Sequence, residues 1–342
     1  MHNFKGVCNL KLEIIAELAQ GFEGRYEQAR LLLKAAASAG ADAGKFQLVY
    51  ADELATPDYK YYDLFTSLEM NDDEWQGLAE YAKELDIKLY VDIFGKRSLA
   101  LSEQIGLSVV KLHGTDISNV GLLEQVATSS VPKIMLGAGG AFASELERAL
   151  EMLASKEVIV LLGFQGYPTP NASNQIARVR LLVDKYNKSR ANVTIGFADH
   201  APPDRPVRYA LAATSIGAGA TVIEKHLTLG QVMKLEDYES ALNPDEFSEF
   251  CEVMNECVDA FGVTGDSESF GMDESELGYR KMIRRHVIAS RDLSIGTCLS
   301  SEDLILKRCS SEQVITDLEL TYGKTLKHAV NANSPLSPSD ID

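Results

Sequence analysis

Two histidines stand at the ends of apolar, β-branched runs of the chain. His226 closes the run Thr221–His226, two residues after Glu224, and His200 follows Val193–Phe197 by three residues. Such runs are typical of short buried strands, and in parallel α/β folds ligands bind where the strands end. Imidazole and carboxylate groups at these positions suit a divalent metal ion or acid–base catalysis. The alternative is that both histidines are hydrogen-bonded residues of the core.

Two lysines also lie within strand-like runs. Lys45 and Lys111 would be costly to bury without a counter-charge, because an unpaired ammonium group loses its hydration. One interpretation is a clamp for the phosphate and carboxylate groups of a substrate. A second is ion pairing inside the protein, for which Asp92, Asp116 and Glu17 are available. A third is a lysine that forms a Schiff base with a carbonyl substrate.

Two glutamates and a tyrosine complete the set of residues that could carry chemistry. Glu17 and Glu224 could act as general acid or base at a carbonyl oxygen or on an attacking water, and they could equally be the partners of the lysines. Tyr167 begins the motif Tyr167–Pro170. This motif could orient a donor substrate or simply form a rigid loop, since its two prolines fix φ.

Strand-like runs alternate with helical patterns along most of the chain. The eight runs are Glu13–Leu18, Ala43–Leu48, Lys88–Ile93, Val109–Leu112, Lys133–Leu136, Val158–Gly163, Val193–Phe197 and Thr221–His226. Eight strand–helix units over roughly 250 residues predict a TIM (β/α)8 barrel, in which the polar residues at the strand ends converge on one mouth. A doubly wound open sheet is the alternative, but no Gly-x-Gly-x-x-Gly sequence follows the first run.

Segments with a 3.6-residue period lie between these runs and after the last one. They are Tyr26–Ala39, Asp72–Leu85, Ser98–Ile105, Val120–Ala127, Ala143–Leu153, Ser173–Tyr186, Pro206–Ile216 and Asp245–Ala260. The acidic stretch Asp72–Glu74 suits the start of a helix, with Asn71 as its N-cap and the carboxylates favoured by the helix dipole.

Composition narrows the class of protein. The chain has 342 residues and a formal net charge of −17, so its field repels nucleic acid and anionic membranes. It contains no apolar run long enough to span a bilayer, and its first residues do not resemble a signal peptide. Its five cysteines are scattered and lack a Cys-x-x-Cys pair. We therefore expect a reduced, cytoplasmic compartment and no structural zinc.

A change of composition after Phe261 predicts a second domain. Gly, Ser, Asp and Glu dominate Gly262–Gly278, which is typical of a linker. Short alternating runs follow, broken by Gly296 and Pro335, and they predict a small β-rich domain. The expected organisation is a barrel over residues 8–265, a linker over 266–281 and a second domain over 282–342.

Seven motifs occur in order along the chain. They are Ile15–Glu17, Gly40–Gln47, Val109–Asp116, Tyr167–Pro170, Gly196–His200, Gly219–Thr228 and Leu242–Glu246. Together they resemble the sialic acid (N-acetylneuraminate) synthase family, including the synthases of spore coat polysaccharide biosynthesis. The segment from His286–Asp292 to Leu306–Arg308 resembles the antifreeze-like (SAF) domain that ends these proteins.

The resemblance implies a function. Such an enzyme condenses phosphoenolpyruvate with an N-acetylmannosamine-type amino sugar, giving a nonulosonic (sialic-acid-like) acid and phosphate for surface polysaccharide biosynthesis. It also implies Mn²⁺ or Mg²⁺ as cofactor and a domain-swapped homodimer. The positions that match the family's functional residues are His200 and His226 for the metal, Lys45, Lys111, Glu17 and Glu224 for catalysis, and Gln47, Gln165, Tyr167, Asp237 and Arg308 for substrate binding, Arg308 reaching the barrel of the other subunit.

The chain departs from the family around the expected phosphate. Asp92, Gly114, Gly137 and Ala198 stand where the family carries small hydroxyl residues, and Gln165 replaces an asparagine. A carboxylate at position 92 would repel a phosphate directly. Two further functions therefore stay open. One is a metal-dependent aldolase or isomerase that has lost the phosphoenolpyruvate site, and the other is a non-catalytic, sugar-binding relative.

Overall fold

The computed structural model describes residues 11–163, 166–186, 189–262, 270–311 and 314–342. The chain divides into two compact units, Met1–Gly262 and Val263–Asp342, and each is described by itself.

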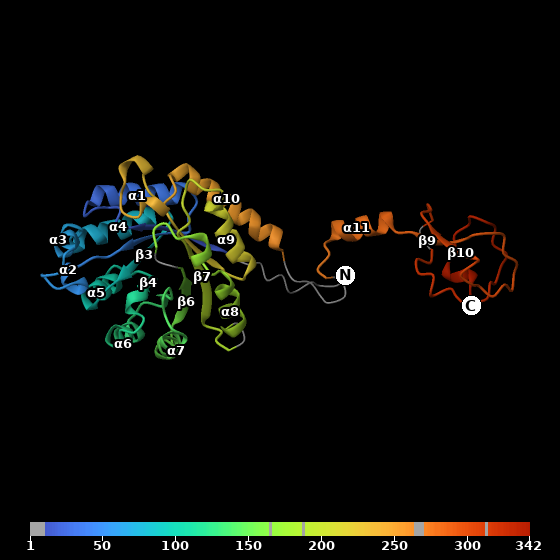
Figure 1. Ribbon diagram of the computed structural model, residues 1–342, viewed down its shortest axis with the longest axis horizontal. Coiled ribbons are helices and arrows are strands. Elements are labelled where there is room, and N and C mark those ends of the chain that lie inside the picture. Colours follow the sequence, from blue (N-terminus) through green and yellow to red (C-terminus); the bar gives the residue numbers. More distant parts are fainter. Residues whose placement is uncertain (1–10, 164–165, 187–188, 263–269, 312–313) are drawn as a thin grey trace. The chain divides into compact units, whose positions relative to one another are not determined.

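The first unit is a closed barrel of parallel strands, so the predicted TIM barrel is confirmed (Figure 1). The strands run in chain order around the barrel, and β8 pairs with β1 to close it. Their bounds lie within two residues of the predicted runs: β1 Glu13–Ala19, β2 Ala43–Gln47, β3 Lys88–Ile93, β4 Val109–Leu112, β5 Lys133–Gly137, β6 Glu157–Leu162, β7 Val193–Asp199 and β8 Val222–His226.

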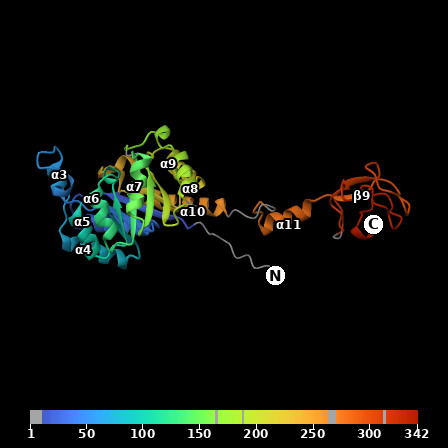
Figure 2. The same cartoon turned by 90° about the horizontal axis from the view of Figure 1, so that it is seen from below.

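Helices surround the strands, as two perpendicular views show (Figures 1 and 2). Those of the first unit are α1 Tyr26–Ser38, α2 Ala51–Leu54, α3 Tyr62–Ser67, α4 Asp72–Glu84, α5 Lys96–Gln104, α6 Val120–Thr128, α7 Ala143–Met152, α8 Ala177–Tyr186, α9 Val207–Gly217 and α10 Pro244–Phe261. The short helices α2 and α3 were not predicted, because neither is long enough to display a helical period. The start of α4 confirms its prediction: the Asn71 side chain accepts from the Glu74 N–H at 2.9 Å.

The core of the barrel has an inner and an outer layer. The outer layer packs the strands against the helices and contains the large apolar side chains, among them Trp75, Phe46 and Phe247. The inner layer fills the interior with residues such as Ile15 and Val222. Because side chains alternate along a strand, the next inward positions after these apolar ones are polar. This alternation brings charged groups together above an apolar floor.

The second unit has its own small core. Strands β9 His286–Ala289 and β10 Leu304–Lys307 form an antiparallel pair, and isolated bridges such as Cys298 to Thr325 tie the remaining loops together. Its apolar residues cluster around Val287 and Leu336. Helix α11, Glu274–Ile283, occupies part of the segment whose composition predicted a linker. The side chain of Asp273 caps it by accepting from the Glu276 N–H at 2.7 Å.

In the part of the chain that the structure describes, no helix has both the length and the apolar character needed to cross a membrane.

Candidate active site

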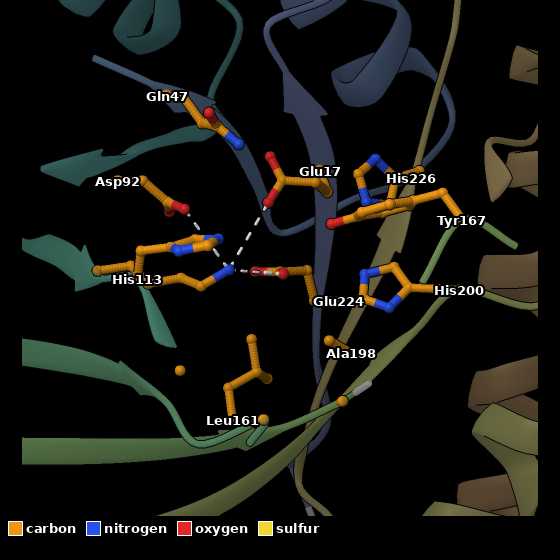
Figure 3. A pocket seen from close by; sticks show the side chains of 14 residues that line it. Glu17, Gln47, Asp92, His113, Leu161, Tyr167, Ala198, His200, Glu224 and His226 are labelled. Carbon is orange, nitrogen blue, oxygen red and sulfur yellow. Dashed lines mark hydrogen bonds and ion pairs between the residues drawn. The ribbon is translucent and has the colours of Figure 1, made fainter. Parts of the chain in front are cut away.

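A small pocket opens at the carboxyl ends of the barrel strands (Figure 3). It collects side chains from strands and loops far apart in the sequence, which confirms that the polar strand ends converge. Its lining consists of Glu17, Gln47, Asp92, Lys111, His113, Gly137, Gly139, Leu161, Gly163, Tyr167, Ala198, His200, Glu224 and His226. Two parts can be distinguished: a lysine half around Lys45 and Lys111, and a histidine half around His200 and His226.

The lysine half is a buried network of ion pairs. The ammonium group of Lys45, which is 0% exposed, contacts the carboxylate of Glu17. It also lies 2.6 Å from Asp92 Oδ1 and 3.5 Å from Glu224 Oε2. Lys111 Nζ donates to Glu224 Oε1 at 2.9 Å. The same nitrogen lies 3.7 Å from Asp92 Oδ2 and 3.8 Å from Glu17 Oε2, as the dashed lines in Figure 3 mark.

These contacts match the internal ion pairing that the sequence left open for the lysines, with one difference. Glu17 and Asp92 are partners of both lysines, whereas Asp116 bonds locally. Its carboxylate accepts from Asn119 Nδ2 at 3.1 Å. Asp116 ends the 3₁₀ turn Gly114–Asp116, and Asn119 caps the helix α6 that follows this turn. Glu224 is the third carboxylate of the network.

The electrostatics of the network separate its two glutamates. Burial raises the pKa of Glu17 to about 8, and the negative charges of Glu224 and Asp92 act in the same direction. Burial would also raise the pKa of Glu224, but Lys111 and Lys45 outweigh it and lower that pKa to about 2. Burial would lower the pKa of Lys45, but Asp92 and Glu17 outweigh it and raise that pKa well above its usual value. At neutral pH the raised pKa of Glu17 therefore favours its protonated form, whereas the lowered pKa of Glu224 keeps that carboxylate ionised.

The backbone is closely packed on the same side of the pocket. A Cβ atom at Gly137 would lie 2.7 Å from the backbone nitrogen of Gly114, closer than real Cβ contacts allow. A Cβ atom at Gly163 would lie 2.8 Å from the Cβ of Ala198. The departures noted in the sequence are thus coupled, since glycine at 137 lets the neighbouring loop approach its strand. A hydroxyl side chain at position 137 does not fit.

The histidine half is formed by three rings. The ring centroids of His200 and His226 are 5.3 Å apart, and both residues are buried. The ring of Tyr167 packs edge-on against both, at 4.8 Å from His200 and 5.5 Å from His226. Burial, together with the positive charge of His200 when protonated, lowers the pKa of His226 well below its usual value. A neutral imidazole is the form that can bind a metal ion.

The two histidines fit a divalent ion as a partial set of ligands. Asp237 Oδ2 lies 3.9 Å from His226 Nδ1, and burial raises the pKa of Asp237 to about 7. Within the described ranges, no three His, Cys, Asp or Glu side chains are arranged to hold a metal ion. Two imidazoles would thus leave the other coordination positions to water and substrate oxygen atoms, a donor set that suits a first-row transition metal.

The remaining predicted site residues are distributed over the chain. Gln47 lines the pocket, and its Oε1 accepts from Gln20 Nε2 at 2.7 Å. Gln165 lies outside the described residues. Arg308 is an exposed residue of the second unit, directly after β10. The structure therefore brings together nine of the eleven predicted positions, counting Lys45 below the pocket and Asp237 beside it.

Sequence reasoning missed three lining residues, Leu161, Gly139 and Gly163. Leu161 is an inward-facing apolar residue like many others. The two glycines carry a weak signal of a site. Gly163 directly follows the end of β6, and Gly139 comes two residues after the end of β5. At such positions the missing side chain allows another backbone segment to approach closely.

Known proteins resemble this chain over most of its length. The chain matches the NeuB family over residues 32–266 and the SAF domain over residues 284–342. It is 26% identical to the N,N'-diacetyllegionaminic acid synthase of Legionella pneumophila, over 94% of this chain and 92% of that protein. It is 25% identical to a pseudaminic acid synthase of Campylobacter jejuni, over 86% of each.

Solved structures show the same architecture. The N-acetylneuraminic acid synthetase from Leptospira borgpetersenii has a TM-score of 0.71 at 24% identity, covering 83% of this chain and 96% of that one. The spore coat polysaccharide biosynthesis protein from Bacillus subtilis has a TM-score of 0.64 at 24% identity, covering 97% and 95%. The chain thus belongs to the NeuB family and is a synthase-like enzyme built from a TIM barrel and a SAF domain.

Proposed function

We propose that the protein joins phosphoenolpyruvate to an N-acetylmannosamine-type amino sugar, forming a nonulosonic acid. The observation that carries the proposal is the division of one pocket into a half with two buried lysines and a half with two buried histidines. Cations suit a donor that carries phosphate and carboxylate groups. Imidazoles that remain neutral suit a metal ion near the sugar aldehyde.

In the reaction, C3 of phosphoenolpyruvate forms a bond to the aldehyde carbon of the sugar. Water adds to C2 of the donor, and cleavage of the bond between C2 and the phosphate oxygen releases phosphate. Glu17 is the candidate acid for the aldehyde oxygen, because its raised pKa keeps it protonated at neutral pH. Glu224 is ionised and lies between the two lysines. Two carboxyl groups with separated pKa values are typical of divided acid and base roles.

His200 and His226 would hold the cofactor, which we propose to be Mn²⁺ or Mg²⁺. When bound, such an ion supplies a Lewis acid that polarises a carbonyl oxygen. Tyr167 packs on both rings and limits their motion. Asp237 lies beside the histidine half and Gln47 lines the pocket, and this supports a role for both in binding hydroxyl or amide groups of the sugar.

The test is a synthase assay. Purified protein is incubated with Mn²⁺, phosphoenolpyruvate and a panel of N-acylated mannosamine derivatives, and both phosphate and the keto acid are measured. We expect phosphate release that depends on the sugar and disappears with EDTA. Absence of phosphate release with every sugar would overturn the proposal.

A specific observation favours a second candidate, a metal-dependent aldolase or isomerase without a phosphoenolpyruvate site. The carboxylate of Asp92 forms an internal ion pair with Lys45, which already neutralises this lysine. The backbone of Gly114 fills the space beside Gly137. Titration calorimetry with phosphoenolpyruvate separates the candidates. Binding in the micromolar to millimolar range supports the synthase, and absence of binding supports the aldolase or isomerase.

We also propose that the protein acts in the cytoplasm as a homodimer in which Arg308 of one chain completes the pocket of another. Scattered free cysteines and the exposed Arg308 support this. Mixing the inactive variants His200→Ala and Arg308→Ala tests it. A domain-swapped dimer regains up to about a quarter of the activity, since some mixed dimers contain one intact site, whereas a monomer regains none.

A further inference from the structure

A second buried ion pair lies directly behind the histidine half. Lys225 Nζ is 3.3 Å from Asp199 Oδ1, and both side chains are 0% exposed. In the described part of the chain, Asp199 Oδ2 has no hydrogen-bond partner, so Lys225 is the group that compensates this carboxylate. The pair is separate from the lysine network, and the proposed reaction does not use it.

The two residues of the pair each precede a histidine in the sequence. Asp199 ends β7 next to His200, and Lys225 lies in β8 next to His226. The two histidines line the pocket. Because neighbouring side chains of a strand point to opposite faces, Asp199 and Lys225 point away from the pocket. The pair therefore links β7 and β8 on the outer side of the barrel. It does so at the carboxyl ends of these strands, where His200 and His226 face the pocket on the inner side.

The pair also holds the backbone that follows His200. Asp199 Oδ1 accepts from the Ala201 N–H at 2.7 Å, and Lys225 Nζ donates to the Ala201 carbonyl at 3.0 Å. Both hydrogen-bonding groups of Ala201 are thus bonded to the pair. This fixes the direction in which the chain leaves β7, and with it the position of the His200 side chain.

Other elements hold the carbonyl of His200 itself. It accepts from the Thr169 N–H at 3.0 Å and from Ser240 Oγ at 3.2 Å. Four hydrogen bonds from four segments of the chain therefore converge on two consecutive residues, His200 and Ala201. On the other strand, the His226 carbonyl accepts from the Leu242 N–H at 2.9 Å. A loop end with so many bonds cannot easily rotate, which is the property that a preorganised site needs.

We infer that Asp199 and Lys225 are positioning residues that set the separation and orientation of the His200 and His226 rings. The functional consequence, a correctly shaped metal site, rests on the proposed function, whereas the geometric consequence does not. Removal of one member would leave an unpaired buried charge and could unfold the barrel. The test therefore uses the double variant Asp199→Asn/Lys225→Met, which keeps the volumes and leaves no buried charge.

Two measurements test the inference on this double variant in the full-length protein. The crystal structure gives the distance between the two ring centroids, which is 5.3 Å in the wild type. Titration with Mn²⁺ gives the affinity. We expect displaced or disordered histidine rings and an affinity about 10- to 100-fold weaker, as for other residues that orient metal ligands. Unchanged rings together with unchanged affinity would overturn the inference.

A matched control separates positioning from general weakening. Glu13 is another partly buried, ion-paired carboxylate of a barrel strand, at the opposite end of the barrel, 2.8 Å from Lys88 Nζ. Glu13→Gln should alter stability but leave the rings and the Mn²⁺ affinity unchanged. A wild-type protein that does not bind Mn²⁺ would refute the proposed metal site, and the ring positions in the double variant would still decide the present inference.

Discussion

The two halves of the pocket differ in what they leave available to a ligand. In the histidine half, the rings of His200 and His226 pack 5.3 Å apart, and burial lowers the pKa of His226 well below its usual value. In the lysine half, every ammonium group already has carboxylate partners at 2.6–3.8 Å. An anion bound there must displace or neutralise an internal partner. The histidine half is therefore built from packed rings, whereas the lysine half is organised around its own carboxylates.

The largest effect is expected from removing the centre of the lysine half. Lys45→Met leaves three buried carboxyl groups with one cation, Lys111, and we expect a loss of about 3–5 kcal/mol in the free energy of unfolding. Urea denaturation measures it. Lys88→Met is the control, because Lys88 is half-exposed in its pair with Glu13 and should change stability by less than about 1 kcal/mol. Equal effects of the two substitutions would contradict the account of the network.

Substitutions in the histidine half should affect the affinity for Mn²⁺ more than the stability of the fold. His200→Ala should weaken Mn²⁺ binding by about 100-fold or more, because one of two protein ligands is lost, while stability falls by about 1–2 kcal/mol. His113→Ala, on the lysine side of the same pocket, should leave the Mn²⁺ affinity within about two-fold. Calorimetric titration compares the two variants. Similar losses would show that the halves are not separate.

Close packing in the lysine half predicts that a hydroxyl side chain cannot be added there. Gly137→Ser places a Cβ atom 2.7 Å from a backbone nitrogen, and we expect a loss of about 1–3 kcal/mol through overpacking. Gly121→Ser is the control, since the nearest atom to its Cβ would be 3.9 Å away. Thermal unfolding measures both. A Gly137→Ser protein as stable as the wild type would show that this side of the pocket can open.

The smallest effect concerns the charge of Asp92. Asp92→Ser removes one carboxylate from the two lysines and should raise the affinity for phosphoenolpyruvate about ten-fold, equivalent to ~1.4 kcal/mol. Asp92→Glu keeps the charge and should bring no such gain. Titration at low and high salt shows whether the gain is electrostatic, because salt screens it. A weaker affinity in Asp92→Ser would mean that Asp92 helps to bind the donor.

Much of this comparison could be predicted from the sequence, because strand alternation and strand ends are local signals. Glu17, Glu224 and the two histidines follow apolar positions with the period of a strand, which places them on one face and at one mouth. The partners of the lysines could be named only as candidates. Asp92 proved correct and Asp116 did not, since pairing depends on which strands become neighbours and on a local turn.

Other features depend on the tertiary structure alone. The sequence shows that Gly137 lacks a hydroxyl but not that a neighbouring loop fills the space. It places Lys225 beside His226, but the bonds from Lys225 to Asp199 and Ala201 arise from the register of two strands. The helix α11 arose in a segment of linker composition, where an Asp cap and a few helix-forming residues suffice.

The division of the pocket is tested most directly by one crystallographic experiment. Crystals soaked with Mn²⁺ and phosphoenolpyruvate are measured at a wavelength where manganese scatters anomalously. We predict an anomalous peak between His200 and His226 and density for an anion at Lys111, with the Asp92 side chain displaced from its present contacts. A manganese peak elsewhere, or occupied histidines with no anion at Lys111, would contradict the account.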